Sequence, residues 1–237
     1  MKKFLWLIFL SSLPFYSAKA QDDLSPVVLE LFTSQSCSSC PPADKILGEL
    51  ADENDNIIDL SCNVTYWNHL HWEDTLSKDF CTQRQRQYVQ HLRSRGPYTP
   101  QIVINGKYEM VGSRESAIKK TIKKDLKDSP IKLITLNLSE QQLDIKLPET
   151  PGSDSYAVSL LAHGKRHTQS IPSGENKGRT VNYTNPVERI ISLGTWDGTG
   201  KTMTYDVSEL PPAQGYVVLA QKNSVVGEII AAGKINP

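Results

Sequence analysis

The sequence has little net charge and, after its start, no long apolar segment. Its 26 basic and 26 acidic residues cancel over the 237 residues. The first twenty residues hold Lys2, Lys3 and Lys19 and no acid, which leaves 23 basic against 26 acidic residues, a net charge of −3, in the rest. This balance argues against a nucleic-acid-binding surface. No later run reaches the roughly 20 apolar residues that cross a bilayer, so we expect no membrane span there.

Several catalytic signatures are also missing. The sequence has no phosphate-binding glycine loop, no dinucleotide fingerprint and no Ser-His-Asp set. Of its four cysteines, only Cys37 and Cys40 are spaced CxxC. A zinc site would need a second such pair or a matched pair of histidines. We therefore predict no resident cofactor and no metal site.

The first twenty residues have the pattern of a secretory signal peptide. Lys2 and Lys3 precede an apolar run from Phe4 to Phe15, and Ala18-Lys19-Ala20 has the small-x-small pattern of a cleavage site. The alternative is an uncleaved N-terminal anchor. We expect an exported protein, periplasmic or secreted, whose partners are exported proteins that carry thiols or disulfides, or a redox partner.

The rest of the chain divides into two halves of different pattern. Residues 27–128 predict strands and helices in the order β-α-β-α-β-β-α, which is the order of the thioredoxin fold. Residues 73–95 have the pattern of a long helix, and Asn105-Gly106 is the strongest short signal for a hairpin turn.

After residue 130 only short strand-like runs follow, separated by turn-rich segments, and the last of these runs covers residues 225–231. The sequence therefore predicts an α/β thioredoxin-like domain over residues 21–130 and a smaller, all-β, sandwich-like domain over residues 131–237.

Cys37 and Cys40 lie between a predicted strand and a predicted helix. A helix N-terminus carries about half a positive charge, which stabilises a thiolate there. Cys37 is thus the candidate attacking thiolate and Cys40 the resolving thiol. Pro41 and Pro42 place the start of the helix directly after Cys40, because proline is tolerated only in the first turn of a helix. The alternatives are a structural disulfide between the two cysteines and a metal site.

Thr99-Pro100 directly precedes a predicted strand. In the thioredoxin fold a cis-proline loop lies against the CxxC, so we expect a cis bond and place Thr99 and Pro100 at the redox site. An ordinary trans proline is the alternative.

Residues 64–72 begin where the second predicted strand ends. Segments that leave the carboxyl ends of adjacent parallel strands lie side by side, so this segment is expected to overhang Cys37. Its Trp67 and His69 would form a rim for a partner or supply a proton. The alternative is that these rings only pack the segment onto the sheet.

Glu30 is a charged residue within the apolar strand that precedes Cys37. A buried carboxylate below the disulfide would accept the proton of Cys40. A Glu30 that is ion-paired or faces the edge of the sheet, without a redox role, is the favoured alternative.

Cys62 lies on the apolar side of the second predicted strand, and Cys81 lies on the helix that follows. A helix covering that face of the sheet would bring the two within the roughly 5.5–6 Å Cα separation of a disulfide. We predict a structural disulfide, with two buried free thiols as the alternative.

Together, these segments resemble the DUF1223 family of secreted thioredoxin-like proteins. The resemblance covers nearly all of the chain after the leader. It implies a thioredoxin-like domain followed by a β-rich domain, with Cys37, Cys40 and Pro100 at the redox centre. The sequence has Asn63 where many members are expected to have His. The segments that carry the resemblance are ELFTSQSCSSCPPAD, VTYWNHLHWEDTLS, RQRQY, YTPQIVINGKYEMVGS, GENKGRTV and NPVERIISLGTWDG.

The leading functional prediction is therefore thiol–disulfide exchange on exported proteins through Cys37 and Cys40. A copper(I)-handling protein is one alternative, because thiolates suit that ion. A non-catalytic binding module with a structural disulfide is the other, and a buried Cys37 sulfur would favour it.

Overall fold

The computed structural model describes residues 25–70, 72–128, 130–150, 152, 154–210 and 213–236. The predicted signal peptide, residues 1–20, lies outside the described residues. Within the described ranges no helix is both long and apolar enough to cross a membrane.

The first half of the chain forms a four-stranded sheet and three helices. Its elements are, in chain order, β1 (Val27–Thr33), α1 (Pro41–Glu53), β2 (Ile57–Asn63), α2 (Asp79–His91), β3 (Gln101–Ile104), β4 (Tyr108–Val111) and α3 (Glu115–Asp128). The strand order is β2-β1-β3-β4. Only β1 and β2 pair in parallel, while β3 pairs antiparallel with both β1 and β4.

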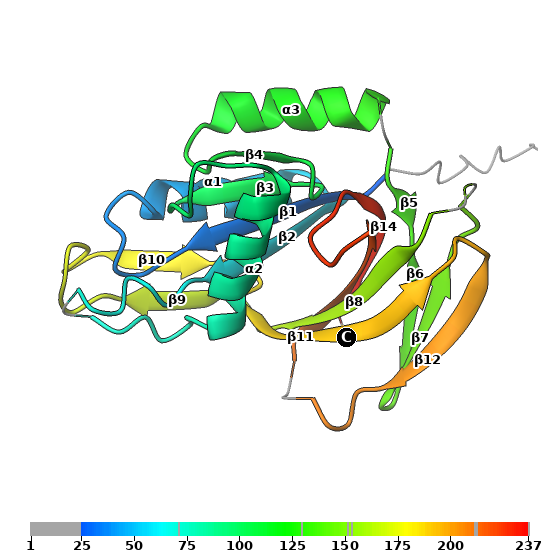
Figure 1. The fold of residues 1–237 in the computed structure, drawn as a ribbon. Coiled ribbons are helices and arrows are strands. Elements are labelled where there is room, and N and C mark those ends of the chain that lie inside the picture. The colour runs from blue at the N-terminus through cyan, green and yellow to red at the C-terminus, as the bar shows by residue number, and fades with distance from the viewer. Residues whose placement is uncertain are drawn as a thin grey trace, which may run out of the picture.

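The second half consists of strands. Its elements are β5 (Lys132–Leu133), β6 (Thr135–Ser139), β7 (Gln142–Leu147), β8 (Tyr156–His163), β9 (His167–Ser170), β10 (Thr180–Tyr183), β11 (Val187–Trp196), β12 (Lys201–Asp206), β13 (Gly215–Lys222) and β14 (Ile229–Ile235). They form a five-stranded sheet β11-β8-β13-β14-β5, a three-stranded sheet β12-β7-β6 and the hairpin β9–β10. Figure 1 shows this hairpin beside α1, away from the other two sheets.

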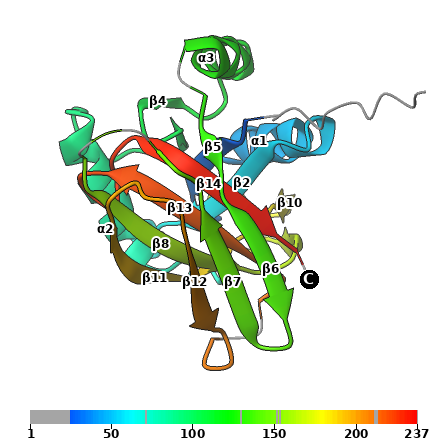
Figure 2. The same ribbon diagram turned by 90° about the vertical axis from the view of Figure 1, so that its right-hand side faces the viewer.

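The five-stranded sheet is a middle layer between two apolar cores. Because successive side chains of a strand point to opposite faces, β13 serves both cores. Val217 and Leu219 pack in one cluster with Val28 and Phe32 of β1. Val218 of the same strand packs in the other cluster, with the side chains of β7. The two views of Figures 1 and 2 show the four-stranded sheet on one side of this layer and β6, β7 and β12 on the other.

β1 is buried on both faces, as its nearly unbroken apolar sequence predicts. Leu29 and Leu31 pack with residues of α1 and α3. Val28 and Phe32 face α2 and the five-stranded sheet instead. One face of the sheet is thus covered partly by another sheet rather than by helices alone.

The predicted fold class, an α/β thioredoxin-like domain followed by a smaller all-β domain, is wrong for this chain. The described residues are mostly β, with 40% in strands and 19% in helices, and the sheets are mixed or antiparallel. The element order over residues 27–128 is as predicted, but it forms only one parallel strand pair. The division at residue 130 stays a prediction, although one core cluster has residues from both sides of it.

The hairpin predicted at Asn105-Gly106 is present between β3 and β4. Both residues have positive φ, 51° and 64°, as a tight hairpin turn of this kind requires. A Cβ on Gly106 would lie 2.2 Å from the carbonyl oxygen of Gly227, which precedes β14. The turn therefore also packs closely against the second half of the chain.

Candidate functional site

Cys37 and Cys40 form a disulfide between the end of β1 and the start of α1. Their Cα atoms are 5.4 Å apart, and Cys40 is the N-cap of the helix. Pro41 and Pro42 occupy the first turn, as predicted, so the first helical hydrogen bonds run from the N–H groups of Ala43 and Asp44 to the carbonyl of Cys40. The prolines thus fix the helix start at the disulfide and remove two free N–H donors.

Both sulfur-bearing residues are shielded from solvent. Cys37 is 3% exposed and Cys40 is 0% exposed, whereas Ser38 and Ser39 between them are exposed. The Ser39 hydroxyl lies 3.4 Å from Cys37 Sγ. The disulfide is therefore close to the surface but covered.

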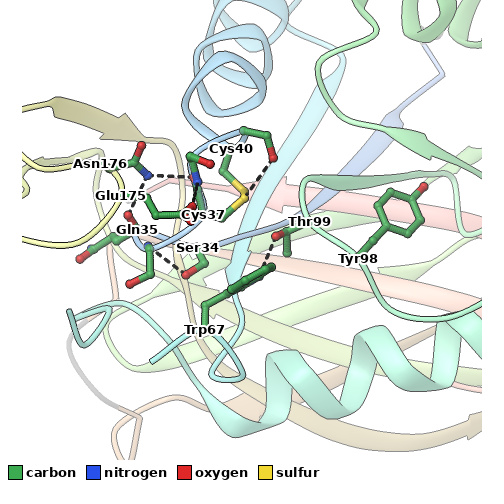
Figure 3. Close-up of a disulfide and its surroundings, with 12 residues drawn as sticks. Ser34, Gln35, Cys37, Cys40, Trp67, Tyr98, Thr99, Glu175 and Asn176 are labelled. Carbon is green, nitrogen blue, oxygen red and sulfur yellow. Dashed lines mark hydrogen bonds between the residues drawn. A yellow bond between two sulfur atoms is a disulfide. The ribbon is translucent and has the colours of Figure 1, made fainter. Parts of the chain in front are cut away.

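The cover over this turn is the β9–β10 loop, residues 171–179. Buried Asn176 donates its side-chain amide to the carbonyl oxygens of Gln35 (2.9 Å) and Cys37 (2.8 Å). Arg179 donates to the carbonyl of Ser38 (3.3 Å), and the Ser38 N–H donates to the carboxylate of Glu175 (3.3 Å). Figure 3 shows Glu175 and Asn176 beside the Cys37 turn. A segment about 140 residues along the chain thus holds the backbone around the disulfide.

These three residues of the β9–β10 loop are site residues that the sequence pattern did not indicate. Glu175, Asn176 and Arg179 lie in GENKGRTV, one of the segments that carry the family resemblance. That resemblance was the available signal, because nothing in local periodicity connects residue 176 with residue 37.

Trp67 and Thr99 lie on the other side of the disulfide from Glu175 and Asn176 (Figure 3). The Trp67 indole N–H donates to the Thr99 hydroxyl at 2.8 Å. The Thr99-Pro100 bond is cis, as predicted. The exposed His69 ring stacks on Trp67, and its Nδ1 lies 3.0 Å from the Tyr66 carbonyl. The contacts of His69 are therefore with its own segment, and none is with Cys37 or Cys40.

Glu30 is ion-paired with Arg84, as the alternative without a redox role expects. Its carboxylate accepts hydrogen bonds from Arg84 Nε at 2.5 Å, Arg84 Nη2 at 3.0 Å and the Tyr88 hydroxyl at 2.5 Å. Arg84 also donates to Gln221 and to the carbonyl of Val225 in the second half of the chain. Glu30 thus belongs to a buried network that ties α2 to β13, on the sheet face opposite α1.

Cys62 and Cys81 form the predicted second disulfide, which joins β2 to α2. Their Cα atoms are 5.3 Å apart, and both residues belong to the core cluster between the sheet and α2. This disulfide lies inside the apolar core, unlike the Cys37–Cys40 pair.

A buried polar cluster lies on the α1 side of the sheet, next to the disulfide. It consists of Thr33, Asp44, Asn63, Asp74 and Tyr183, all nearly inaccessible. Burial raises the pKa of Asp44 well above the ordinary aspartate value; the nearby Thr33 hydroxyl lowers it and Asp74 raises it further. Burial also raises the pKa of Asp74, against hydrogen bonds from Asn63 and from the backbone of Gln35. Burial, then Asp44 and Asp74, raise the pKa of Tyr183.

Asp44 and Asp74 are site residues that sequence reasoning missed. Asp44 follows Cys40 by four residues in CPPAD, and Asp74 lies in the WEDT part of another segment that carries the resemblance. Asn63, the position at which we expected His in many family members, donates its side-chain amide to Asp74 at 2.9 Å. The spacing of Asp44 from Cys40 was therefore a usable signal, whereas the burial of both acids was not visible in the sequence.

Among the residues that the structure describes, no group of three or more His, Cys, Asp or Glu side chains is arranged to hold a metal ion. Among these described residues, His69 is turned toward Tyr66 and Trp67 rather than toward the Cys37–Cys40 pair.

Comparison with known proteins gives an extensive structural match and a family. The crystal structure of protein AGR_C_4864 from Agrobacterium tumefaciens is 27% identical, with a TM-score of 0.78, and the match covers 89% of this chain and 93% of that one. Superoxide reductase from Giardia intestinalis (14% identity, 44% of this chain, 96% of that chain) has a TM-score of 0.26. This value is too low to carry an argument. No functionally curated protein matches the sequence. Residues 28–221 match the family described as "Protein of unknown function (DUF1223)", and the chain therefore belongs to the DUF1223 family.

Proposed function

We propose that this protein catalyses thiol–disulfide exchange through Cys37 and Cys40, with thiol- or disulfide-bearing exported proteins as its partners. The observation that carries the proposal is the position of the pair at the start of α1, beneath the exposed turn of Ser38 and Ser39. A helix N-terminus favours the thiolate that exchange requires. The Ser39 hydroxyl, 3.4 Å from Cys37 Sγ, offers a further hydrogen bond to that thiolate.

The two disulfides differ in how much they can contribute to stability. In the chain-entropy model a cross-link stabilises more when it closes a longer loop. The Cys62–Cys81 link has a sequence separation of 19 and the Cys37–Cys40 link a separation of 3. The corresponding contributions are about 3 and about 2 kcal/mol. Stability alone is thus a weaker reason for the Cys37–Cys40 bond than for the other.

The exchange reaction needs access to the Cys37 sulfur. A partner thiolate attacks Cys37 Sγ, a mixed disulfide forms, and the Cys40 sulfur leaves with the electron pair of the broken bond. Because Cys37 is 3% exposed, its cover has to move aside first, and we infer that the β9–β10 loop is the part that moves. Hydrogen bonds keep this loop in place. They join Asn176, Arg179 and Glu175 to the backbone of residues 35–38. Loops held by a few such bonds are the parts of proteins that open locally.

A non-catalytic binding module with a structural disulfide is the second candidate. The burial of Cys37 favours it, because a buried sulfur is protected from attack. The two candidates differ in one consequence: only exchange produces covalent intermediates with other proteins.

Trapping of mixed disulfides tests the proposal. A Cys40→Ser variant, expressed with its leader in an exporting bacterium, keeps the attacking cysteine but cannot resolve the intermediate. We expect covalent complexes that disappear on reduction and that are missing from the matched Cys37→Ser, Cys40→Ser control. Equal yields from the two variants would favour the structural role and end the exchange proposal.

A further inference from the structure

Asp44 lies one helical turn after Cys40 on α1. Its N–H donates to the Cys40 carbonyl at 3.1 Å, so the two residues are related as i and i+4 in a regular helix. In this relation Cβ atoms are about 5–6 Å apart, and helical side chains tilt toward the N-terminus. The Asp44 carboxyl is therefore directed toward the end of the helix that carries the disulfide.

The Asp44 carboxyl is buried, and only the Thr33 hydroxyl is near it among the described residues. It is 2% exposed, and neither carboxylate oxygen has a hydrogen-bond partner of good geometry among the described residues, although the Thr33 hydroxyl is near. Buried polar atoms are nearly always paired, so an unpaired carboxyl calls for an explanation. Burial without a partner favours the protonated form.

The charged groups around α1 are engaged elsewhere. Lys45 pairs with Glu49, Arg166 pairs with Asp52, and Arg179 bonds to Ser38 and Asn176. The remaining titratable groups that face Asp44 are Asp74 from the segment before α2 and Tyr183 from β10. Asp74 adds to the effect of burial, and both disfavour the Asp44 carboxylate relative to the protonated carboxyl.

We propose that Asp44 is the proton donor to, and acceptor from, the Cys40 sulfur during exchange. This inference rests on the proposed function. A partner thiolate bonds to Cys37 Sγ, the Cys37–Cys40 bond breaks, and its electron pair stays on Cys40. The Asp44 proton then moves to that sulfur, which leaves a carboxylate. In the reverse direction the Asp44 carboxylate takes the Cys40 proton, and the new thiolate expels the partner from Cys37.

The buried Asp44 carboxyl lies close to a surface cleft. It borders a cleft of about 750 Å³ between α1 and β10, which Pro41, Pro42 and Tyr183 line as well. In the proposed cycle, a proton taken from Cys40 leaves through this cleft. Glu30, the acid that the sequence pattern singles out, has no such position because it is ion-paired with Arg84 on the other face of the sheet.

The test compares Asp44→Asn with wild type in reduction of the native disulfide by dithiothreitol from about pH 4 to about pH 9. Rates are corrected for the thiolate fraction of the reductant. General acid catalysis contributes roughly 10²–10⁴-fold, so Asp44→Asn should slow reduction at least about tenfold below neutral pH. Asp44→Glu should recover part of the rate. The control is Asp55→Asn, an exposed aspartate near the end of α1, which should match wild type.

A second measurement uses wild-type protein and does not require the Asp44→Asn variant. The infrared difference spectrum between reduced and oxidised wild-type protein should show a change in a protonated carboxyl band. Its absence would overturn the inference, even if Asp44→Asn does not fold. Equal corrected rates for wild type and a folded Asp44→Asn would overturn it too, and would leave the proposed function intact. A native Cys37–Cys40 bond that dithiothreitol cannot reduce would refute both.

Discussion

The side-chain amide of Asn176 donates a 2.8 Å hydrogen bond to the carbonyl oxygen of Cys37, across 139 residues of sequence. A second bond from the same amide reaches Gln35. One buried asparagine thus joins the second half of the chain to the backbone that carries the disulfide. Access to Cys37 should depend on how often this contact breaks.

Replacing Asn176 with Ala should expose the disulfide. Each hydrogen bond contributes about 0.5–1.5 kcal/mol, so loss of two should favour the open loop by roughly 5- to 150-fold. We expect native-state reduction of Cys37–Cys40 to accelerate within that range, as measured by quenching with an alkylating reagent and mass spectrometry. Asn182→Ala, at an exposed position of β10, is the matched control. Identical rates for both variants would mean that the loop does not limit access.

The two disulfides should differ in their effect on stability. Replacing Cys62 and Cys81 together with Ala should lower the free energy of unfolding by about 3 kcal/mol, because this bond closes the longer loop. Replacing Cys37 and Cys40 with Ala should cost less, about 2 kcal/mol. Urea denaturation of both double variants measures the two losses in the free energy of unfolding and shows which is larger. The opposite order would assign the main structural role to Cys37–Cys40.

Glu30→Gln should destabilise the fold without altering exchange. The variant leaves the Arg84 guanidinium buried without its carboxylate, which costs about 3–5 kcal/mol. Glu49→Gln removes an exposed pair with Lys45 on α1 and should change stability by less than about 1 kcal/mol. Urea denaturation measures both. A Glu30→Gln protein of normal stability with an altered pH profile of exchange would restore Glu30 as the proton acceptor.

Asp44 should make stability fall as the pH rises. Burial raises its pKa in the folded protein above the unfolded value, so the folded state binds the proton more tightly. The stabilisation is fully present below the ordinary aspartate pKa of about 3.9 and is lost as the pH rises through the folded pKa. Between the unfolded and the folded pKa of Asp44, the free energy of unfolding falls by up to about 1.4 kcal/mol per pH unit.

Urea denaturation of wild type and Asp44→Asn at a series of pH values isolates this effect, since Asp74 is common to both. The stability of Asp44→Asn relative to wild type should increase with pH across the window and then level off. A difference that does not change with pH would show that the Asp44 carboxyl is not shifted upward.

The first half of the chain was predictable because its signals are local. Apolar periodicity indicated β1, β2 and the helices, and Asn105-Gly106 indicated the β3–β4 turn. The Cys62–Cys81 bond followed from the apolar side of β2 and the helix over it. The bounds were less accurate: α2 covers residues 79–91, whereas residues 73–95 have a helical pattern.

What the sequence did not reveal depends on distant contacts. β9 and β10 are short and largely polar, so their alternation is weak. The strand expected over residues 225–231 starts only at Ile229, because Gly227 lies in a turn too tight for a Cβ. The cover of Asn176 over Cys37 and the burial of Asp44 beneath β10 arise only when the halves pack together. The same packing of sheet on sheet made the expected α/β class wrong.

Redox titration of the folded protein tests the central proposal most directly. Native protein is equilibrated in thiol–disulfide buffers of graded potential, alkylated and mapped by mass spectrometry, with Cys62–Cys81 as the internal control. Structural disulfides have potentials below about −300 mV, whereas catalytic pairs lie between about −270 and −120 mV. We predict a potential in the catalytic range for Cys37–Cys40 and one below about −300 mV for Cys62–Cys81. Two disulfides that both resist reduction beyond about −300 mV would contradict the account and leave Cys37–Cys40 as a structural bond.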